Sequence, residues 1–469
     1  MQINTQTFSL DEVSVLNTLQ QGAWVEENTA ILVVHGVGNQ RPLETLDMFA
    51  RGLVNVYLKQ AQHDRTSLIL EHRVAVKDGA NGRKWFDNFI RFRSANSDFH
   101  IDVYECFWAH HPEEQVSVND LQKWVEHTAQ GAEDFYAQKQ FAEKSGDSSY
   151  FIKDQEFDAG RYRRTIWLAV QVIPALTRMT TSLLNFARRI PGIAALASST
   201  LDKFCETAFA QLTSVAGDVV AYNTMDQKAR LFEIRQRVLN SAVDAIRYLI
   251  EPRQATSTSK KTERPYGNVI IVAHSLGTQI SFDAINKLSH LISQGEIAGV
   301  APNGDLIGVP GDVKKHVSDL LSAYATFGSP LDKIAFFFRD KSKKEEYFRR
   351  QILKHFHCFK EKDWDDRQEG ELPLNDEMKA RFFQNIQWRN YFDCNDPISG
   401  RLDYYDKVHN IDCRFVKHKP GEKSAWYARF WPFTHSYYWS SEMMFADIVA
   451  NLVHRNSAQT PASNRAIAG

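Results

Sequence analysis

One segment constrains the fold of this chain more than any other: an apolar run that leads directly into a turn and then into a helical pattern. Residues 268–273 read NVIIVA, which is typical of a strand buried on both faces of a sheet. Residues 274–277 read HSLG, and the apolar spacing from Leu276 to about Ile292 predicts a helix. A buried strand that turns straight into a helix is the repeating unit of an α/β protein.

Other short apolar runs predict further strands of the same sheet, at 30–35, 100–107, 322–327, 386–392 and 413–417. Helical patterns alternate with them, most clearly over 219–250, and 440–453 predicts a closing amphipathic helix. Strands that alternate with helices predict a mostly parallel central sheet, flanked by helices and joined by right-handed crossovers.

The predicted core is interrupted by inserted segments. A long helical stretch at 113–215 predicts a large helical insertion, a lid or cap, and within it 165–199 predicts an amphipathic hairpin that is either buried or faces lipid. The predicted division is an N-terminal extension (1–28), three core parts (29–112, 216–334 and 386–455), the helical insertion (113–215), a charged helical insertion (335–385) and a disordered tail (456–469).

Composition excludes several classes of protein. The formal net charge of −1 gives no global attraction to nucleic acid, and no nucleic-acid-binding motif is present. The odd number of cysteines, five, and their wide spacing argue against a disulfide framework. The N-terminal residues lack the basic start and apolar core of a secretory signal, so we expect a cytoplasmic location.

Ser275 is the candidate nucleophile. A nucleophile on a sharp strand-to-helix turn needs small residues two positions before and after it, and Ala273 and Gly277 meet that need. The turn resembles the G-x-S-x-G elbow of α/β hydrolases, with alanine in place of the first glycine. The helix N-terminus and the Leu276 N–H would stabilise an oxyanion. The alternative is a serine that merely begins a helix.

The loop after the first core strand reads HGVG, residues 35–38. It resembles the HG-x-G loop with which many lipases and esterases supply a second oxyanion donor. The resemblance implies that the Val37 amide pairs with the Leu276 amide, supported by His35, Gly36 and Gly38. The alternative is an ordinary glycine turn between a strand and a helix.

A serine nucleophile needs a histidine and a carboxylate, which in α/β hydrolases follow it in the order acid, then histidine. Asp396 lies in the segment WRNYFDCNDPISG (388–400), just beyond a predicted strand, and this segment resembles the acid segment of intracellular lipase-like hydrolases. Asp396 is alternatively a turn residue before proline. Asp332 is the alternative acid, and Asp393 and Asp403 are further candidates.

His435 is the candidate base. It lies in FTHSYYW (433–439), between the last predicted strand and the closing helix, which is where the superfamily carries its catalytic histidine. Two other histidines lie near the last predicted strand: His409 precedes it and His418 follows it.

Taken together, HGVGNQ, GDVVAY, VAHSLG, TFGSPLD, WRNYFDCNDPISG and THSYYW resemble an intracellular lipase and esterase branch of the α/β-hydrolase superfamily. The likeness is to DDHD-type phospholipases and GPI inositol-deacylase-like hydrolases, and it covers the core blocks only. It implies hydrolysis of lipid carboxylic esters through an acyl-serine intermediate, without a metal or an organic cofactor.

Two features bear on the substrate and on the membrane. Aromatic residues surround the candidate base, either as core packing or as an acyl-chain pocket or membrane-facing lip: Trp426, Tyr427, Phe430, Trp431, Phe433, Tyr437, Tyr438 and Trp439. Residues 339–360 are net basic, either as a solvated helix or as a site for anionic head groups. Peripheral contact with a membrane is therefore an open expectation.

Other functions fit the same residues. An acyltransferase, a thioesterase or a serine peptidase uses the same triad with another acceptor or substrate. A catalytically idle domain that serves as a membrane-associated interaction module is the alternative from another class, and a toxin-like phospholipase is also compatible. The sequence leaves the oligomeric state open.

Overall fold

The computed structural model of the chain describes residues 7–9, 23–36, 41–59, 65–73, 88–108, 152–153, 156–157, 230–251, 253–254, 262–263, 266–300, 306–331, 345–348, 372–373, 386–393, 396, 399–402, 408–413, 415 and 433–454.

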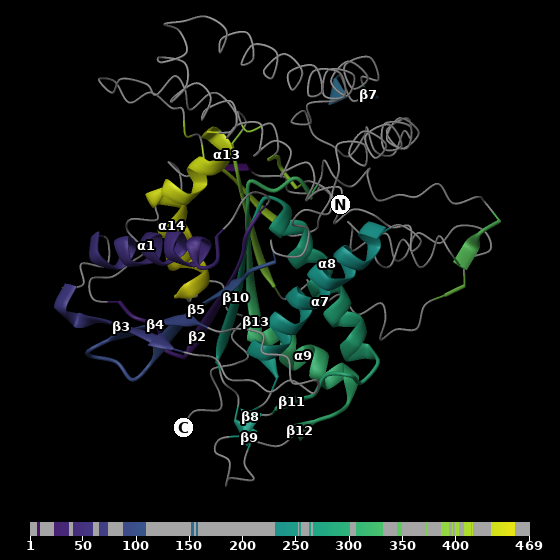
Figure 1. The fold of residues 1–469 in the computed structure, drawn as a ribbon, viewed down its shortest axis with the longest axis horizontal. Helices are drawn as coiled ribbons and strands as arrows, with labels where there is room; N and C mark the ends of the chain where they lie inside the picture. Colours follow the sequence, from purple (N-terminus) through teal and green to yellow (C-terminus); the bar gives the residue numbers. More distant parts are fainter. Residues whose placement is uncertain are drawn as a thin grey trace, which may run out of the picture.

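The described residues form a central sheet of nine strands, mostly parallel, as the sequence predicts (Figure 1). Its strands from edge to edge are β1 (Thr7–Ser9), β15 (Val408–Asp412), β14 (Gln387–Phe392), β13 (Leu321–Phe327), β10 (Asn268–His274), β2 (Thr29–Val34), β5 (His100–Cys106), β4 (Phe89–Ser94) and β3 (Leu68–Arg73). The first seven strands of this order, from β1 at one edge to β5, all pair in parallel. The last two, β4 and β3, are antiparallel: β4 pairs with β5, and β3 pairs with β4. The carboxyl ends of the parallel strands therefore share one edge of the sheet.

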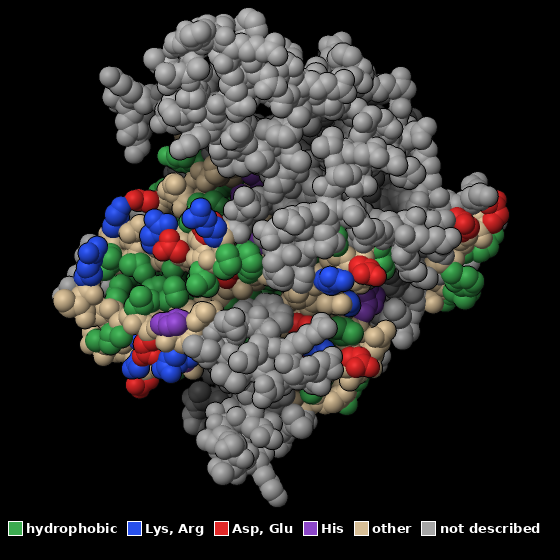
Figure 2. Space-filling model, viewed as in Figure 1, with side chains coloured by type: hydrophobic (Ala, Val, Ile, Leu, Met, Phe, Trp, Pro, Cys, Tyr) green, Lys and Arg blue, Asp and Glu red, His purple; other side chains and the backbone are tan. Residues whose placement is uncertain are grey.

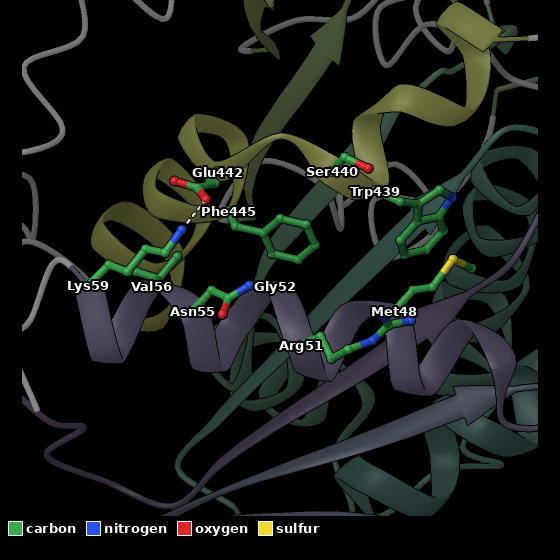
Figure 3. A pocket seen from close by; sticks show the side chains of 10 residues that line it. All are labelled: Met48, Arg51, Gly52, Asn55, Val56, Lys59, Trp439, Ser440, Glu442 and Phe445. Atoms are coloured by element: carbon green, nitrogen blue, oxygen red, sulfur yellow. Dashed lines mark hydrogen bonds and ion pairs between the residues drawn. The ribbon is translucent and has the colours of Figure 1, made fainter. Parts of the chain in front are cut away.

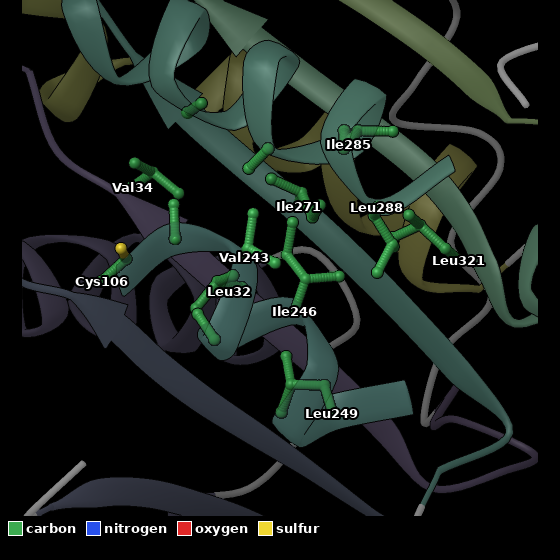
Figure 4. Close-up of a cluster of buried hydrophobic side chains, with 14 of the residues drawn as sticks. Leu32, Val34, Cys106, Val243, Ile246, Leu249, Ile271, Ile285, Leu288 and Leu321 are labelled. Atoms are coloured by element: carbon green, nitrogen blue, oxygen red, sulfur yellow. The ribbon is translucent and has the colours of Figure 1, made fainter. Parts of the chain in front are cut away.

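Helices cover both faces of this sheet (Figure 1). On one face lie α7 (Arg230–Ile250), α8 (Leu276–Ser293) and α9 (Pro310–Leu320), and on the other lie α1 (Glu44–Lys59) and α14 (Glu442–Ile448). Successive side chains of a strand point to opposite faces, so each central strand supplies both layers. Ile271 packs with α7 and α8 (Figure 4), and its neighbour Ile270 packs with α1 and α14.

The remaining described elements are short. They are the 3₁₀ helices η2 (Arg65–Ser67) and η6 (Tyr438–Ser440), the π-helix η7 (Val449–Val453), the helix α13 (Phe433–Tyr437) and three two-stranded ladders, β6 with β7 (Ile152–Lys153, Glu156–Phe157), β8 with β9 (Arg253–Gln254, Thr262–Glu263) and β11 with β12 (Gly299–Val300, Leu306–Ile307).

One predicted strand was wrong. The expected strand at 413–417 is instead β15, Val408–Asp412, so His409 lies within the last strand and not before it. The hydropathy pattern does not indicate this strand, because its buried central residue, Asn410, is polar. Asn410 is hydrogen-bonded to Asn390. The other predicted core strands lie within two residues of those observed.

Several elements were not expected from the sequence: β1, α1, β3 and β4. The predicted insertions lie almost wholly outside the described residues, including the hairpin at 165–199 and most of 335–385. The same holds for the start of the predicted helix at 219–250 and for the tail from 456.

The described surface carries both charges side by side. Basic and acidic side chains lie close together around α1, β3 and β4 (Figure 2). Arg51 and Asp47 form an ion pair on α1, and Arg93 of β4 pairs with Glu71 of β3. This mixture matches the nearly neutral net charge. No helix in the described part of the chain has the length and hydropathy that crossing a bilayer requires.

Candidate active site

Ser275 occupies a strained turn between β10 and α8. Its backbone has φ 52° and ψ −128°, a region that residues with a side chain rarely adopt. An ordinary N-cap serine has extended dihedrals and accepts a hydrogen bond from the first turn with its hydroxyl. Ser275 makes no such side-chain bond, so its hydroxyl is not occupied by capping the helix. This geometry disfavours the reading in which Ser275 merely begins a helix.

Close backbone packing explains the small residues around this turn. A Cβ atom on Gly277 would lie 2.4 Å from the His35 oxygen and 2.5 Å from the Val34 oxygen. A Cβ atom on Gly36 would lie 2.6 Å from the Ser275 Cβ. The end of β2 and the first turn of α8 therefore touch across the turn, and glycine is required on both sides.

The first turn of α8 presents N–H groups next to Ser275. The first N–H groups of a helix lack intrahelical acceptors, and Leu276 is the first residue of α8. The Ser275 N–H itself donates to the Phe327 oxygen at 3.1 Å, which ties the turn to the end of β13. The predicted oxyanion donor Leu276 thus lies at a helix N-terminus, where partial positive charge favours an anion.

His435 and Asp396 form a hydrogen-bonded pair. The Nδ1–H of His435 donates to Oδ2 of Asp396 at 2.8 Å, and both residues are buried. A proton held on Nδ1 leaves Nε2 as the acceptor, which is the tautomer that a general base requires. The two residues come from separate segments, the loop after β14 and the helix α13, and the sequence predicted both.

A neighbouring aspartate has a different role. Asp393, a further candidate for the acid, accepts a hydrogen bond from the Phe415 N–H at 2.7 Å with its Oδ2. The hydroxyl of Tyr438 accepts from the Asp393 N–H at 2.9 Å and donates to Oδ2 of Asp396 at 3.2 Å. Asp396 is therefore the carboxylate that faces His435. The other candidates, Asp332 and Asp403, lie outside the described residues.

An amide network holds the loop that carries Asp396. The Nδ2 of Asn390 donates to the Gly400 oxygen and to Oδ1 of Asn410, each at 2.9 Å. The same Asn410 oxygen accepts from the Leu402 N–H at 2.9 Å. This network ties Gly400 and Leu402 to strands β14 and β15. In the sequence Asn390 stands within the WRNYFDCNDPISG motif, and nothing there indicates its bracing role.

His35 supports the loop after β2. Its Nδ1–H donates to the Gly36 oxygen at 2.8 Å, and its Nε2 accepts from the Trp108 N–H at 3.2 Å. The ring stacks on the Trp108 indole, with centroids 4.9 Å apart. His35 is fully buried and braces the end of β2 through these contacts. The predicted oxyanion donor Val37 and its neighbour Gly38 lie outside the described residues.

The nucleophile and the base lie on adjoining segments but are not hydrogen-bonded. The Nε2 of His435 is buried and has no hydrogen-bond partner in the described part of the chain. The His435 ring packs on His274, the residue before Ser275, with centroids 4.8 Å apart. Contacts between a nucleophile and its base are often long until substrate binds, so this arrangement is compatible with a triad.

His274 is a component of the site that sequence reasoning missed. It is buried, and its Nε2–H donates to the backbone oxygen of His435 at 3.0 Å. Burial, with His435 beside it, lowers the pKa of His274 to about 3, so the ring is neutral. The sequence signal was its place next to Ser275, but a histidine there has no fixed role.

The predicted aromatic cluster is only partly described. Tyr438 is buried and donates a hydrogen bond to Asp396, whereas Tyr437 is 44% exposed. Trp426, Tyr427, Phe430 and Trp431 lie outside the described residues, as does the side chain of Phe433.

A cavity of about 370 Å³ lies beside the site, between α1 and the segment that contains η6 and α14 (Figure 3). Trp439 lines this cavity, and its ring also packs edge-on against His274, with centroids 5.4 Å apart. Ser275, Asp396 and His435 do not line it. The cavity is therefore distinct from the space above the nucleophile.

Within the described ranges, no three His, Cys, Asp or Glu side chains are grouped so that they could hold a metal ion. Comparisons of the chain with protein-family models, with curated proteins and with solved structures gave no match. The function is therefore inferred from the geometry of the site.

Proposed function

We propose that this chain is a serine hydrolase of the α/β-hydrolase type that cleaves carboxylic esters through an acyl intermediate on Ser275. One observation carries the proposal: Ser275 occupies a strained strand-to-helix turn with a hydroxyl that does not cap the helix. The hydrogen-bonded pair of His435 and Asp396 lies beside that turn, against His274.

The order of the elements supports this proposal. Ser275 follows the central strand β10, Asp396 follows β14, and His435 follows the last strand, β15. This is the order nucleophile, acid, histidine that is typical of α/β hydrolases. All three residues follow carboxyl ends of parallel strands, and open α/β sheets bind their ligands at that edge.

The proposed chemistry is acyl transfer in two steps. The Ser275 oxygen attacks the ester carbonyl carbon while Nε2 of His435 takes the serine proton, and Asp396 stabilises the imidazolium. The Leu276 N–H holds the oxyanion, together with Val37 by resemblance. His435 then gives its proton to the departing alcohol. Water attacks the acyl-serine in the second step, with His435 again taking and returning a proton.

The substrate class rests on the resemblance and on the aromatic residues around the base. We propose lipid or phospholipid esters, because Tyr437 is exposed close in sequence to the buried His435 and belongs to an aromatic segment. Peripheral contact with a membrane and a cytoplasmic location belong to the same proposal.

The test uses a fluorophosphonate probe together with p-nitrophenyl esters and phospholipid vesicles. The unaltered chain is expected to be labelled and to hydrolyse esters, and Ser275→Ala is expected to abolish both. Asp396→Asn is expected to lower kcat by roughly 10⁴-fold, as in other serine triads. The control Ser293→Ala, at the end of α8, is expected to keep full activity. Full activity of Ser275→Ala would refute the proposal, and absence of labelling and turnover in the unaltered chain would favour an idle module.

A further inference from the structure

A second histidine contacts the proposed triad from the nucleophile side. The His274 side chain leaves β10 one residue before Ser275, and its ring lies against the ring of His435. Phe327 and Trp439 also pack on it, with centroids 5.0 Å and 5.4 Å from the His274 ring. These contacts restrict the ring to one orientation.

The hydrogen bond of His274 fixes its tautomer. Its Nε2 must carry the proton, because the group 3.0 Å away is the backbone oxygen of His435, which only accepts. Its Nδ1 is buried and has no hydrogen-bond partner in the described part of the chain. A neutral ring with the proton on Nε2 satisfies the carbonyl and adds no charge beside the base. The titratable groups that act on His274 are His435, Asp396 and His35.

We propose that His274 is a positioning residue that holds the backbone of His435 in register with the nucleophile turn. This inference rests on the proposed function. The Asp396 bond at Nδ1 orients the His435 ring, whereas the His274 bond anchors the peptide from which that ring extends. Because His274 and Ser275 are adjacent in the chain, this hydrogen bond fixes the position of the His435 backbone relative to Ser275.

The close approach of a neighbouring strand end supports this role. A Cβ atom on Gly328, at the end of β13, would lie 3.0 Å from Cε1 of His435 and 3.1 Å from Nε2 of His274. Gly328 has φ 60°, a conformation that glycine adopts without strain. The glycine therefore leaves room for the two rings to pack on each other, and the hydrogen bond from His274 to the His435 backbone oxygen is part of a closely packed arrangement.

The experiment compares three replacements of His274. Glutamine places a side-chain N–H near the position of the histidine Nε2, asparagine is one methylene shorter, and leucine removes the donor. Each variant is measured for kcat and KM on a p-nitrophenyl ester, for the rate of fluorophosphonate labelling, and for its melting temperature. His72→Leu, on the exposed face of the edge strand β3, is the control.

The expected result is a loss confined to the reactive step. His274→Leu and His274→Asn are expected to lower kcat and the labelling rate by about 10- to 100-fold with little change in KM, because a shift of about 1 Å in a catalytic group costs that much. His274→Gln is expected to restore both rates to within about threefold of the unaltered chain, because one donor replaces another.

The outcomes separate this inference from the proposed function. Unaltered kcat and labelling in both His274→Leu and His274→Asn would overturn the inference, as would a glutamine variant that loses as much activity as asparagine at equal melting temperature. If His274→Leu does not fold, the comparison of His274→Gln with His274→Asn still tests the inference. Failure of the proposed function shows itself in the unaltered chain, as absent labelling or an active Ser275→Ala.

Discussion

Replacing Gly277 by alanine tests the packing that shapes the Ser275 turn. The added Cβ atom would lie 2.4 Å from the His35 oxygen and 2.5 Å from the Val34 oxygen, whereas ordinary contacts begin at 3.4 Å. Both oxygens belong to the backbone at the end of β2. That strand pairs with β10 on one side and β5 on the other, so it cannot move away without disturbing the centre of the sheet.

The expected cost follows from two opposing terms. Overpacking of a closely packed site typically destabilises by about 1–3 kcal/mol, and an overlap of about 1 Å against rigid backbone belongs at the upper end of that range. Alanine gains about 0.5–1 kcal/mol over glycine within a helix. We therefore expect Gly277→Ala to lower the free energy of unfolding by about 2 kcal/mol.

The assay is urea unfolding followed by tryptophan fluorescence, where the midpoint should fall without a change in slope. The matched control is Gly311→Ala in the first turn of α9, where a Cβ atom meets nothing within 4 Å. That control is expected to be neutral or to stabilise by up to about 1 kcal/mol. Equal stability of Gly277→Ala and the unaltered chain would refute the close approach of α8 to β2.

Three further predictions use the same unfolding assay or a labelling assay. Ser275→Gly should stabilise the fold by about 1 kcal/mol, because glycine adopts φ 52° without strain; a loss of stability would contradict the strained turn. Asp447→Asn should destabilise by about 3–5 kcal/mol, because Arg389 donates to Asp447 twice in the core and would lose its charged partner; a cost below about 1 kcal/mol would argue against this pair. Cys106 and Cys413 should resist iodoacetamide in the native state and react in urea, since burial raises the pKa of both thiols; peptide mass spectrometry checks this, and rapid native labelling would contradict their burial.

The parts of the fold that the sequence predicts are those buried on both faces. Strands β2 and β10 consist of consecutive buried residues, so their apolar runs are unambiguous. Strands β3 and β4 read LILEHR and FIRFRS, which mix apolar and charged residues, and they pair antiparallel. Such strands near a sheet edge give a weak signal, because no residue of β3 and only half of the residues of β4 are buried.

Helix α1 shows a different limit. Its buried residues, among them Leu46, Phe49 and Leu53, have the spacing of an amphipathic helix, so this element was within reach of a sequence argument. Its start depends on a distant residue: Glu105, at the end of β5, accepts the Leu43 and Thr45 N–H groups. A helix start held by another strand has no local capping signature for a sequence argument to find.

Some parts of the candidate site depend on residues close in sequence, and others depend on contacts between distant segments. The Ser275 turn is local, since the residues that permit it lie within two positions and the strand and helix are contiguous. The choice between Asp393 and Asp396 is not local. Both aspartates follow the same strand, and they differ in their contacts with distant residues: Asp393 accepts from the Phe415 N–H, whereas Asp396 accepts from His435.

The contact between His274 and His435 joins residues 161 positions apart, and one partner is a backbone oxygen. Every residue type has a backbone oxygen, so the residue type at position 435 gives no indication of this hydrogen bond. The tie exists only because β10 and the segment after β15 end at the same edge of the sheet. The strand order therefore explains a contact that the residue pattern does not predict, because it places His274, the residue before the nucleophile, next to His435. The tautomer of His274 then follows from its partner: a backbone oxygen only accepts, so Nε2 of His274 carries the proton.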